Sequence, residues 1–74
     1  MTEFDHILVF KTDIKDISDK DTIAPLLNAD TRIKQWSIDQ DDEDLVLRVV
    51  THQLKHHHII NLITGSGYNC CELT

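Results

Sequence analysis

Cysteine, glycine, proline and aromatic residues are all scarce in this sequence of 74 residues. The two cysteines, Cys70 and Cys71, are adjacent, so they cannot join distant parts of the chain as disulfides do in small secreted domains. We expect both to be thiols in a reducing compartment. With two glycines and one proline, the sequence also shows no linker, repeat or low-complexity segment apart from the acidic run 39–44 and the histidine run 56–58.

Long apolar runs and basic residues are equally short in supply. No run approaches the length of a membrane span, and the first ten residues lack the basic start and apolar stretch of a signal peptide. Thirteen acidic residues face seven basic ones, for a formal charge of -6, which repels nucleic acid and anionic lipid. The sequence therefore predicts a cytoplasmic protein whose partner is a basic protein face or a cation, with no nucleic acid and no membrane.

The length limits both architecture and activity. Seventy-four residues form a single domain, 1–74, near the lower limit for a core without disulfides or metals. A large enclosed active site is not expected. Ser18, Ser37 and Ser66 lack a nucleophile motif, and no glycine loop for phosphate is present. We predict that the protein is not an enzyme.

Hydrophobic periodicity predicts six elements. Residues 5–14 alternate as a strand, with Leu8, Phe10, Thr12 and Ile14 on one face. A short or kinked helix is expected from Ser18 or Asp19 to near Asn28, because Pro25 interrupts it. Residues 31–39 and 45–51 are expected to form a hairpin around the polar residues 40–44, with Ile33 displaced by a bulge and with Leu45, Leu47 and Val49 on one face.

The last third of the chain completes the pattern. Leu54, Ile59, Leu62 and Ile63 have helical spacing, and this stripe stops at Gly65 and Gly67. Residues 68–74 are long enough for a closing strand. The order predicts an α+β fold, a ferredoxin-like βαββαβ sandwich in which two helices cover one face of a four-stranded antiparallel sheet.

The segments "FKTDIK", "APLLN", "IKQWSID", "LVLRVV" and "IINLI" leading into "GSGY" resemble the heavy-metal-associated domains of copper chaperones and metal-pumping ATPases. The likeness is closest to their short bacterial stand-alone members. The resemblance implies a C-x-x-C motif after the first strand, where two thiolates hold a soft ion such as copper(I). In this sequence Asp16 and Asp19 occupy the two cysteine positions, so the resemblance implies a degenerate member without that motif. It also implies the fold of the family and a docking surface at the end of the sandwich where this turn lies.

Asp16 and Asp19 admit three interpretations. They can cap the helix and favour the positive end of its dipole, they can bind magnesium or calcium weakly, or they can mark a lost metal site. In the predicted topology the first turn, the acidic hairpin and the Gly65–Tyr68 loop lie at one end. The candidate docking patch for a basic partner consists of Asp13, Asp39, Asp41, Asp42, Glu43 and Asp44, together with the two turn aspartates. The alternative is that the acidic run is only a solvated turn.

Two further groups could hold a metal. If the second helix includes His52, then His52 and His56 are spaced i, i+4, and with His57 they suit zinc, nickel or copper(II); polar helix residues are the alternative. Cys70 and Cys71 should point to opposite faces of a strand, one in the core and one exposed. A soft ion bridging a cysteine between two copies is a further alternative to core packing.

Three hypotheses follow. The leading one is a non-catalytic interaction module that docks its acidic end, or a sheet edge, onto a partner or a second copy. The second is a protein for transition-metal binding or transport at the histidines or cysteines. The third is a small enzyme or regulator of an unnamed ligand.

Overall fold

The computed structural model describes residues 7–73, which contain four strands and two helices. They follow in the order β1 (Ile7–Thr12), α1 (Ile17–Ala29), β2 (Ile33–Asp39), β3 (Val46–Thr51), α2 (His56–Thr64) and β4 (Cys70–Glu72). Residues 5, 6 and 74 of the predicted strands lie outside the described residues. Neither helix within residues 7–73 is long and apolar enough to cross a membrane.

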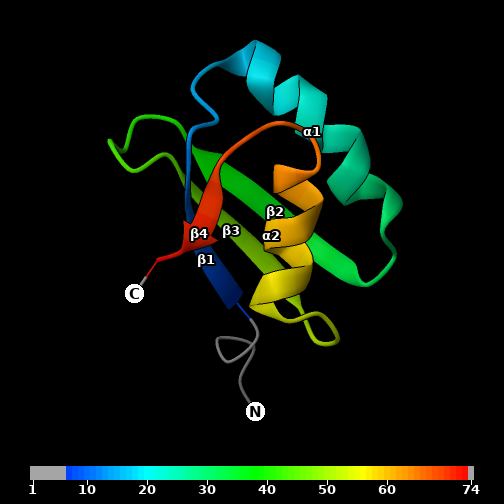
Figure 1. Ribbon diagram of the computed structural model, residues 1–74. Coiled ribbons are helices and arrows are strands. Elements are labelled where there is room, and N and C mark those ends of the chain that lie inside the picture. Colours follow the sequence, from blue (N-terminus) through cyan, green and yellow to red (C-terminus); the bar gives the residue numbers. More distant parts are fainter. Residues whose placement is uncertain (1–6, 74) are drawn as a thin grey trace.

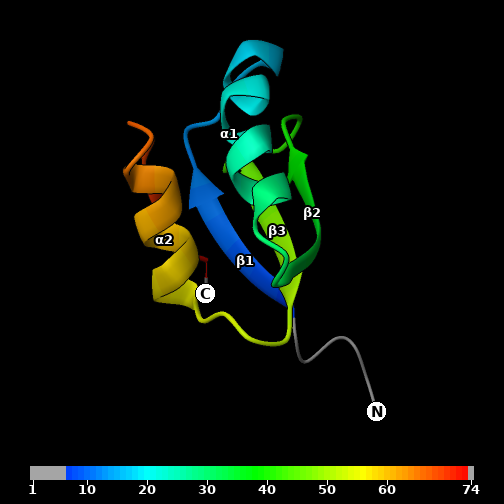
Figure 2. The ribbon, with the colours of Figure 1, turned by 90° about the vertical axis from the view of Figure 1, so that its right-hand side faces the viewer.

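The strands form one antiparallel sheet in the order β2-β3-β1-β4. Both helices lie on the same face of this sheet and leave its other face open (Figure 1, Figure 2). The central strands β1 and β3 each have two neighbours, while β2 and β4 are the edges. This arrangement confirms the predicted ferredoxin-like sandwich.

The core lies between the sheet and the helices because every second strand residue points toward them. Phe10, Leu47 and Val49 contribute from the central strands, and all three are fully buried. The helices contribute Ile23 and Leu27 from α1 and Ile59 and Ile63 from α2. Burying one such side chain stabilises the fold by roughly 1.5–3 kcal/mol.

Helix α1 begins earlier than predicted and continues through its proline. It starts at Ile17 and not at Ser18 or Asp19, because the side chain of Asp16 accepts the backbone N–H of Asp19 and so acts as the N-cap. Pro25 lies inside the helix, which reaches Ala29. The helix tolerates the missing N–H because Ile23 and Leu27, on either side of the proline, are packed in the core.

Two other boundaries also differ from the prediction. Leu45 does not belong to β3; its backbone adopts a left-handed conformation with φ 49° where the hairpin turns. Leu54 is buried, as its apolar character suggests, but it precedes α2 and is not part of its stripe. The predicted bulge near Ile33 is confirmed by a register shift between Ile33 and Gln35 against β3.

Candidate functional site

The turn between β1 and α1 is organised by two carboxylates. Asp16 Oδ1 accepts the N–H of Asp19 at 2.9 Å, and Asp19 Oδ2 accepts the N–H of Lys15 at 3.1 Å. Carboxylates are favoured here because the first turn of a helix presents unpaired N–H groups and the positive end of its dipole. The capping interpretation is thus confirmed for Asp16, and the Asp19 carboxylate accepts a matching bond from Lys15, the residue before the cap.

The same turn is tied to two other segments of the chain. The hydroxyl of Tyr68, in the loop after α2, donates to Asp19 Oδ1 at 2.9 Å. The side-chain amide of Gln40 donates from the hairpin to the Asp16 carbonyl oxygen at 2.7 Å. The bond from Tyr68, followed by that from the Lys15 N–H, lowers the pKa of Asp19 below its ordinary value. These contacts confirm that the first turn, the hairpin and the loop before β4 lie at one end.

Asp13 serves the neighbouring loop in a similar way. One of its oxygens accepts the backbone N–H of Asn69 at 2.8 Å, and the other accepts the Asn69 side-chain amide at 3.0 Å. This carboxylate was predicted as part of a docking patch. The structure places it at the expected end, where it also orders the entry into β4.

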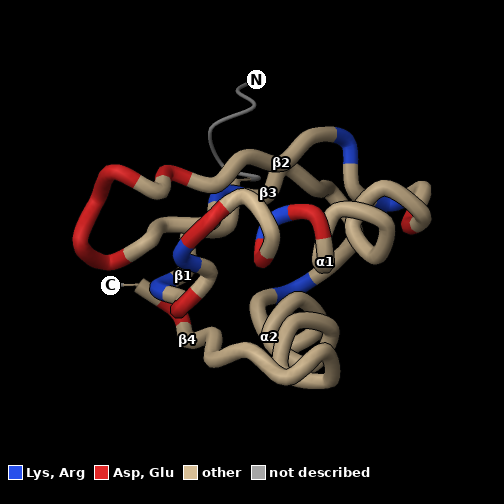
Figure 3. Tube along the Cα trace, turned by 90° about the horizontal axis from the view of Figure 1, so that it is seen from above, with Lys and Arg blue, Asp and Glu red and all other residues tan. Residues whose placement is uncertain are grey.

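The hairpin loop between β2 and β3 carries the densest negative charge and reaches away from the body of the domain (Figure 3). Asp39 Oδ1 accepts the N–H of Asp41 at 3.1 Å, and Asp42 Oδ1 accepts the N–H of Asp44 at 2.8 Å. These local bonds shape the loop, while Asp41, Asp42 and Glu43 stay exposed. We define the acidic end by the following residues: Asp13, Asp16, Asp19, Asp39, Asp41, Asp42, Glu43 and Asp44.

One apolar residue of this end was missed by the sequence reasoning. Ile17, the first residue of α1, is 71% exposed, the largest exposure among the large hydrophobic side chains described. It lies between the two turn aspartates and outside the core cluster. Its signal in the sequence is weak because a single isoleucine next to a helical stripe does not reveal which way it points.

The histidines do not form the predicted grip. Because α2 begins at His56, His52 lies outside the helix, and the i, i+4 pairing on one helical face is wrong. His56 Nε2 lies 3.6 Å from Glu72 Oε2, and its ring meets Phe10 edge-on with centroids 5.4 Å apart. Across residues 7–73 no three or more His, Cys, Asp or Glu side chains gather where they could share a metal ion.

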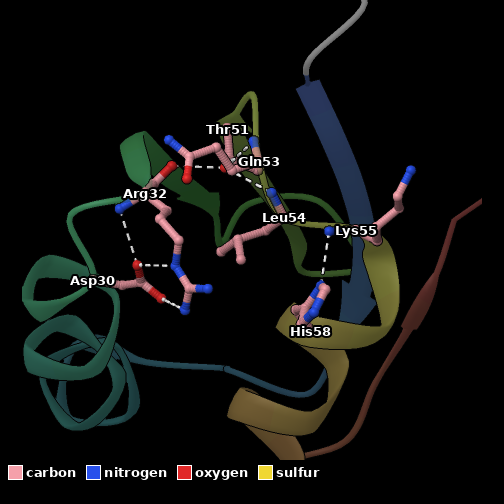
Figure 4. Close-up of polar contacts among 7 residues, drawn as sticks. All are labelled: Asp30, Arg32, Thr51, Gln53, Leu54, Lys55 and His58. Atoms are coloured by element: carbon pink, nitrogen blue, oxygen red, sulfur yellow. Dashed lines mark hydrogen bonds and ion pairs between the residues drawn. The ribbon is translucent and has the colours of Figure 1, made fainter.

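The two following histidines have local roles at the start of α2. The rings of His57 and His58 lie against each other with centroids 4.2 Å apart. His58 Nδ1 accepts the N–H of Lys55 at 3.0 Å, as Figure 4 shows.

In the same region Asp30 pairs with the guanidinium of Arg32 at 3.0 Å, and the Thr51 hydroxyl donates to the Arg32 carbonyl oxygen (Figure 4). These contacts fasten the end of the domain where α1 finishes and α2 starts.

The cysteines divide as predicted: Cys70 is buried and Cys71 is exposed. Burial, and then the neighbouring Cys71, raises the pKa of the Cys70 thiol to about 12. Both border a shallow hollow of about 410 Å³, which is also lined by Lys11, Thr12, Asp13, Thr64 and Asn69. Since their side chains leave the strand on opposite sides, they do not act as a chelating pair.

No family model and no curated protein matches this sequence. Two solved structures do match the fold. The copper(I)-loaded first domain of the human copper chaperone for SOD1 is 20% identical with a TM-score of 0.76, and the match covers 89% of each chain. The apo HMA domain of a copper chaperone for superoxide dismutase is 19% identical with a TM-score of 0.77, covering 92% of this chain and 66% of that one. This chain therefore has the heavy-metal-associated fold of copper-chaperone domains.

Proposed function

We propose that this chain is a non-catalytic heavy-metal-associated-like domain that works as a protein-interaction module, docking its acidic end onto a basic face of a partner protein. The observation that carries the proposal is the use made of the two turn carboxylates. Three of their four oxygens accept hydrogen bonds from within the chain, from Asp19 N–H, Lys15 N–H and the Tyr68 hydroxyl. The turn is held together by these bonds.

The donors in the turn do not fit copper(I). That ion prefers soft thiolate ligands, whereas Asp16 and Asp19 offer hard carboxylate oxygens. Both thiols of the chain belong to β4, where Cys70 is buried and its raised pKa disfavours the thiolate. The turn therefore has a structural task and no role in copper(I) transfer.

Charge supports a basic partner. The chain has a formal charge of -6, and the acidic end holds eight of its thirteen acidic residues. Such a field raises the association rate with a positive surface and discriminates against negative ones. Because the hairpin and the turn are already ordered by local hydrogen bonds, little conformational entropy is lost when a partner binds.

The acidic end also contains an apolar centre. Ile17, between Asp16 and Asp19 in the sequence, is largely exposed. Protein interfaces commonly combine a small apolar centre with a charged rim, and this end offers both. The partner surface we expect is correspondingly basic around a small apolar area.

The test is capture of a partner from lysate at low and high salt, followed by binding measurements with the purified partner. Asp41→Asn/Glu43→Gln removes two charges from the acidic end at side chains that make no hydrogen bonds within residues 7–73. Gln53→Lys/Asn61→Lys is the matched control, since it changes the net charge equally at exposed positions on other segments. We expect salt and the first variant to weaken binding, while the control binds as the wild type does.

The competing function is transition-metal binding away from the turn. It is favoured by the copper(I)-loaded state of one structural neighbour and by the approach of His56 to Glu72. Titration of untagged, reduced protein with zinc and with copper(I), followed by NMR, distinguishes the two. Saturable chemical-shift changes at His52, His56, His57, Cys70 or Cys71, with a micromolar dissociation constant for the metal, contradict the docking proposal. The absence of such changes supports it.

A further inference from the structure

The face of the sheet that the helices leave open is partly apolar. Residues Val9 on β1 and Val50 on β3 alternate with core residues and therefore point to this face, as does Ile7, the register partner of Val50. The amide of Leu73 donates to the Val9 carbonyl oxygen at 3.0 Å, so the ladder continues beyond β4 and places Leu73 on the same face as Cys71. Apolar side chains thus run across three neighbouring strands.

On the open face the central strands present four apolar residues, Ile7, Val9, Val46 and Val50, and two basic ones, Lys11 and Arg48, whereas the edge strand β2 is polar. On the open face β2 presents Gln35, Ser37 and Asp39. A short, largely apolar run is consistent with a strand that is covered on both faces. An antiparallel sheet with one solvated face typically alternates apolar and polar residues, and four of the six open-face positions of β1 and β3 are apolar instead.

Val46, on the open face of β3, is buried although no helix covers it. It is only 3% exposed, yet it does not belong to the core cluster beneath the helices. Its register partners on the open face are Lys11 and Asp39, whose side chains flank it. The open face therefore has one buried residue at its hairpin end, while Val9 and Val50, farther from the hairpin, are half-buried.

The charges on this face are complementary to one another. Arg48 is exposed at the middle of β3, and among residues 7–73 it has no carboxylate partner. Lys11 by contrast pairs with Asp44 at 3.7 Å. Asp39 lies on the neighbouring strand at the rim of the same face. A surface that carries an unpaired cation in its middle and an anion at its rim can satisfy both charges against a copy of itself.

We propose that the open sheet face, formed by Ile7, Val9, Arg48, Val50, Cys71 and Leu73 with Asp39 at its rim, is the interface of a homodimer. In a two-fold pairing each Arg48 meets the Asp39 of the other copy, and the apolar strips of the two sheets pack together. Two sheets stack about 10 Å apart when side chains of this size interdigitate. The acidic end shares Asp39 with this face, so the dimer presents the remaining residues of the acidic end twice; the proposal does not depend on the proposed function.

The experiment is sedimentation velocity of the full, untagged and reduced chain over a wide concentration range. We expect a reversible shift from the 8.5 kDa chain to its dimer. Arg48→Glu should weaken the dimer at least tenfold, and Asp39→Lys should act in the same direction. An equimolar mixture of the two variants should regain the dimer. In the mixed dimer the carboxylate introduced at position 48 of one copy faces the ammonium introduced at position 39 of the other, and the second contact keeps its native pair.

Lys55→Glu is the matched control: it changes the net charge as much as Arg48→Glu does, at an exposed position outside the sheet. It should leave the dimer constant within about twofold, a difference that corresponds to surface charge alone. Val50→Thr keeps the shape and strand preference of the residue and should weaken the dimer by severalfold. Alkylation of Cys71 should slow as the protein concentration rises.

Several outcomes overturn the inference. A monomer at every concentration does so directly. If Arg48→Glu and Val50→Thr leave the dimer unchanged, the two copies meet at another surface. If the mixture of Arg48→Glu and Asp39→Lys stays monomeric, the proposed ion pair does not form. Because circular dichroism of each variant reports its fold separately, loss of the dimer through unfolding is recognised as such.

Discussion

The hydroxyl of Tyr68 donates a hydrogen bond to Asp19 Oδ1 at 2.9 Å, although 49 residues separate the two in the sequence. The bond joins the loop after α2 to the first turn of α1. Together with the Gln40 side chain, which reaches the Asp16 carbonyl oxygen, it connects three segments at the acidic end. The geometry of that end therefore depends on contacts between distant parts of the chain.

Removing this hydroxyl should loosen the turn. We expect Tyr68→Phe to lower the melting temperature and to shift the backbone NMR signals of residues 15–19, because the Asp19 carboxylate then accepts a hydrogen bond only from the Lys15 N–H. Tyr68→Phe is the mildest change available, since it preserves the ring. A variant with unaltered signals in residues 15–19 would show that the turn is held without this bond.

The same variant should change the pH dependence of stability. The pKa of Asp19 lies below its ordinary value of 3.8, first because of the Tyr68 hydrogen bond and then because of the Lys15 N–H. A carboxyl with a lowered folded-state pKa adds stability above its unfolded pKa, and this stability is lost as the pH falls through the folded value. Thermal unfolding between neutral pH and pH values below 3.8 should therefore show a steeper acid loss for the wild type than for Tyr68→Phe.

Asp30 provides an internal control for that profile. Its pKa is also lowered, first by the hydrogen bond from the Arg32 side chain and next by that from the Arg32 backbone N–H. This contribution has the same sign and should persist in Tyr68→Phe. Equal acid sensitivity of the two proteins would contradict the assigned role of Tyr68.

Asp16 should act through its cap more than through its charge. We expect Asp16→Ala to lower the free energy of unfolding by about 1 kcal/mol, the usual cost of losing an N-cap. Asp16→Asn retains an oxygen that can accept the Asp19 N–H and should come within a few tenths of the wild type. Urea denaturation measures both values; equal losses for Ala and Asn would assign the effect to charge.

The two cysteines should react very differently. Iodoacetamide at neutral pH is expected to modify Cys71 alone, because Cys70 is buried and its pKa is raised to about 12. Mass spectrometry should find one adduct on the folded protein and two after unfolding. Cys71→Ser should carry none while folded, and a rapid adduct on Cys70 would place that thiol outside the core.

Pro25 should reduce the stability of α1. It removes one backbone N–H from the helix interior, and α1 nonetheless continues to Ala29. We expect Pro25→Ala to raise the free energy of unfolding by up to ~3 kcal/mol, as the helix propensities of the two residues suggest. Lys20→Ala, at an exposed position of the same helix, should change it little. A loss of stability in Pro25→Ala would mean that the proline shapes α1 for packing.

Prediction from the sequence was most accurate where periodicity was strong. In β1 and β3 the alternation of apolar residues places Phe10, Leu47 and Val49 in the core, as predicted. It was least accurate at boundaries. The pairing of His52 with His56 depended on His52 belonging to the second helix, but the helix starts four residues later, where the His58 side chain accepts the Lys55 N–H. That bond involves a residue type rarely counted as a start signal.

The candidate site could likewise be predicted only in part. The two aspartates at the start of α1 could be located from the sequence, and capping was among the interpretations offered for them. Their bond partners could not be predicted, since Tyr68 and Gln40 approach the turn only when α2 and the hairpin are packed on the sheet. The exposure of Ile17 likewise depends on the direction in which the first turn leaves β1.

By itself, the sequence determined the order of the strands and helices, the negative charge, and the absence of cysteine from the first turn, because these depend on local patterns and composition. Tertiary structure alone decided which carboxylates are engaged, that His52 and His56 do not share a helical face, and that one apolar sheet face is left open. Those features arise from contacts between residues far apart in the chain, and no local pattern encodes the geometry of such contacts.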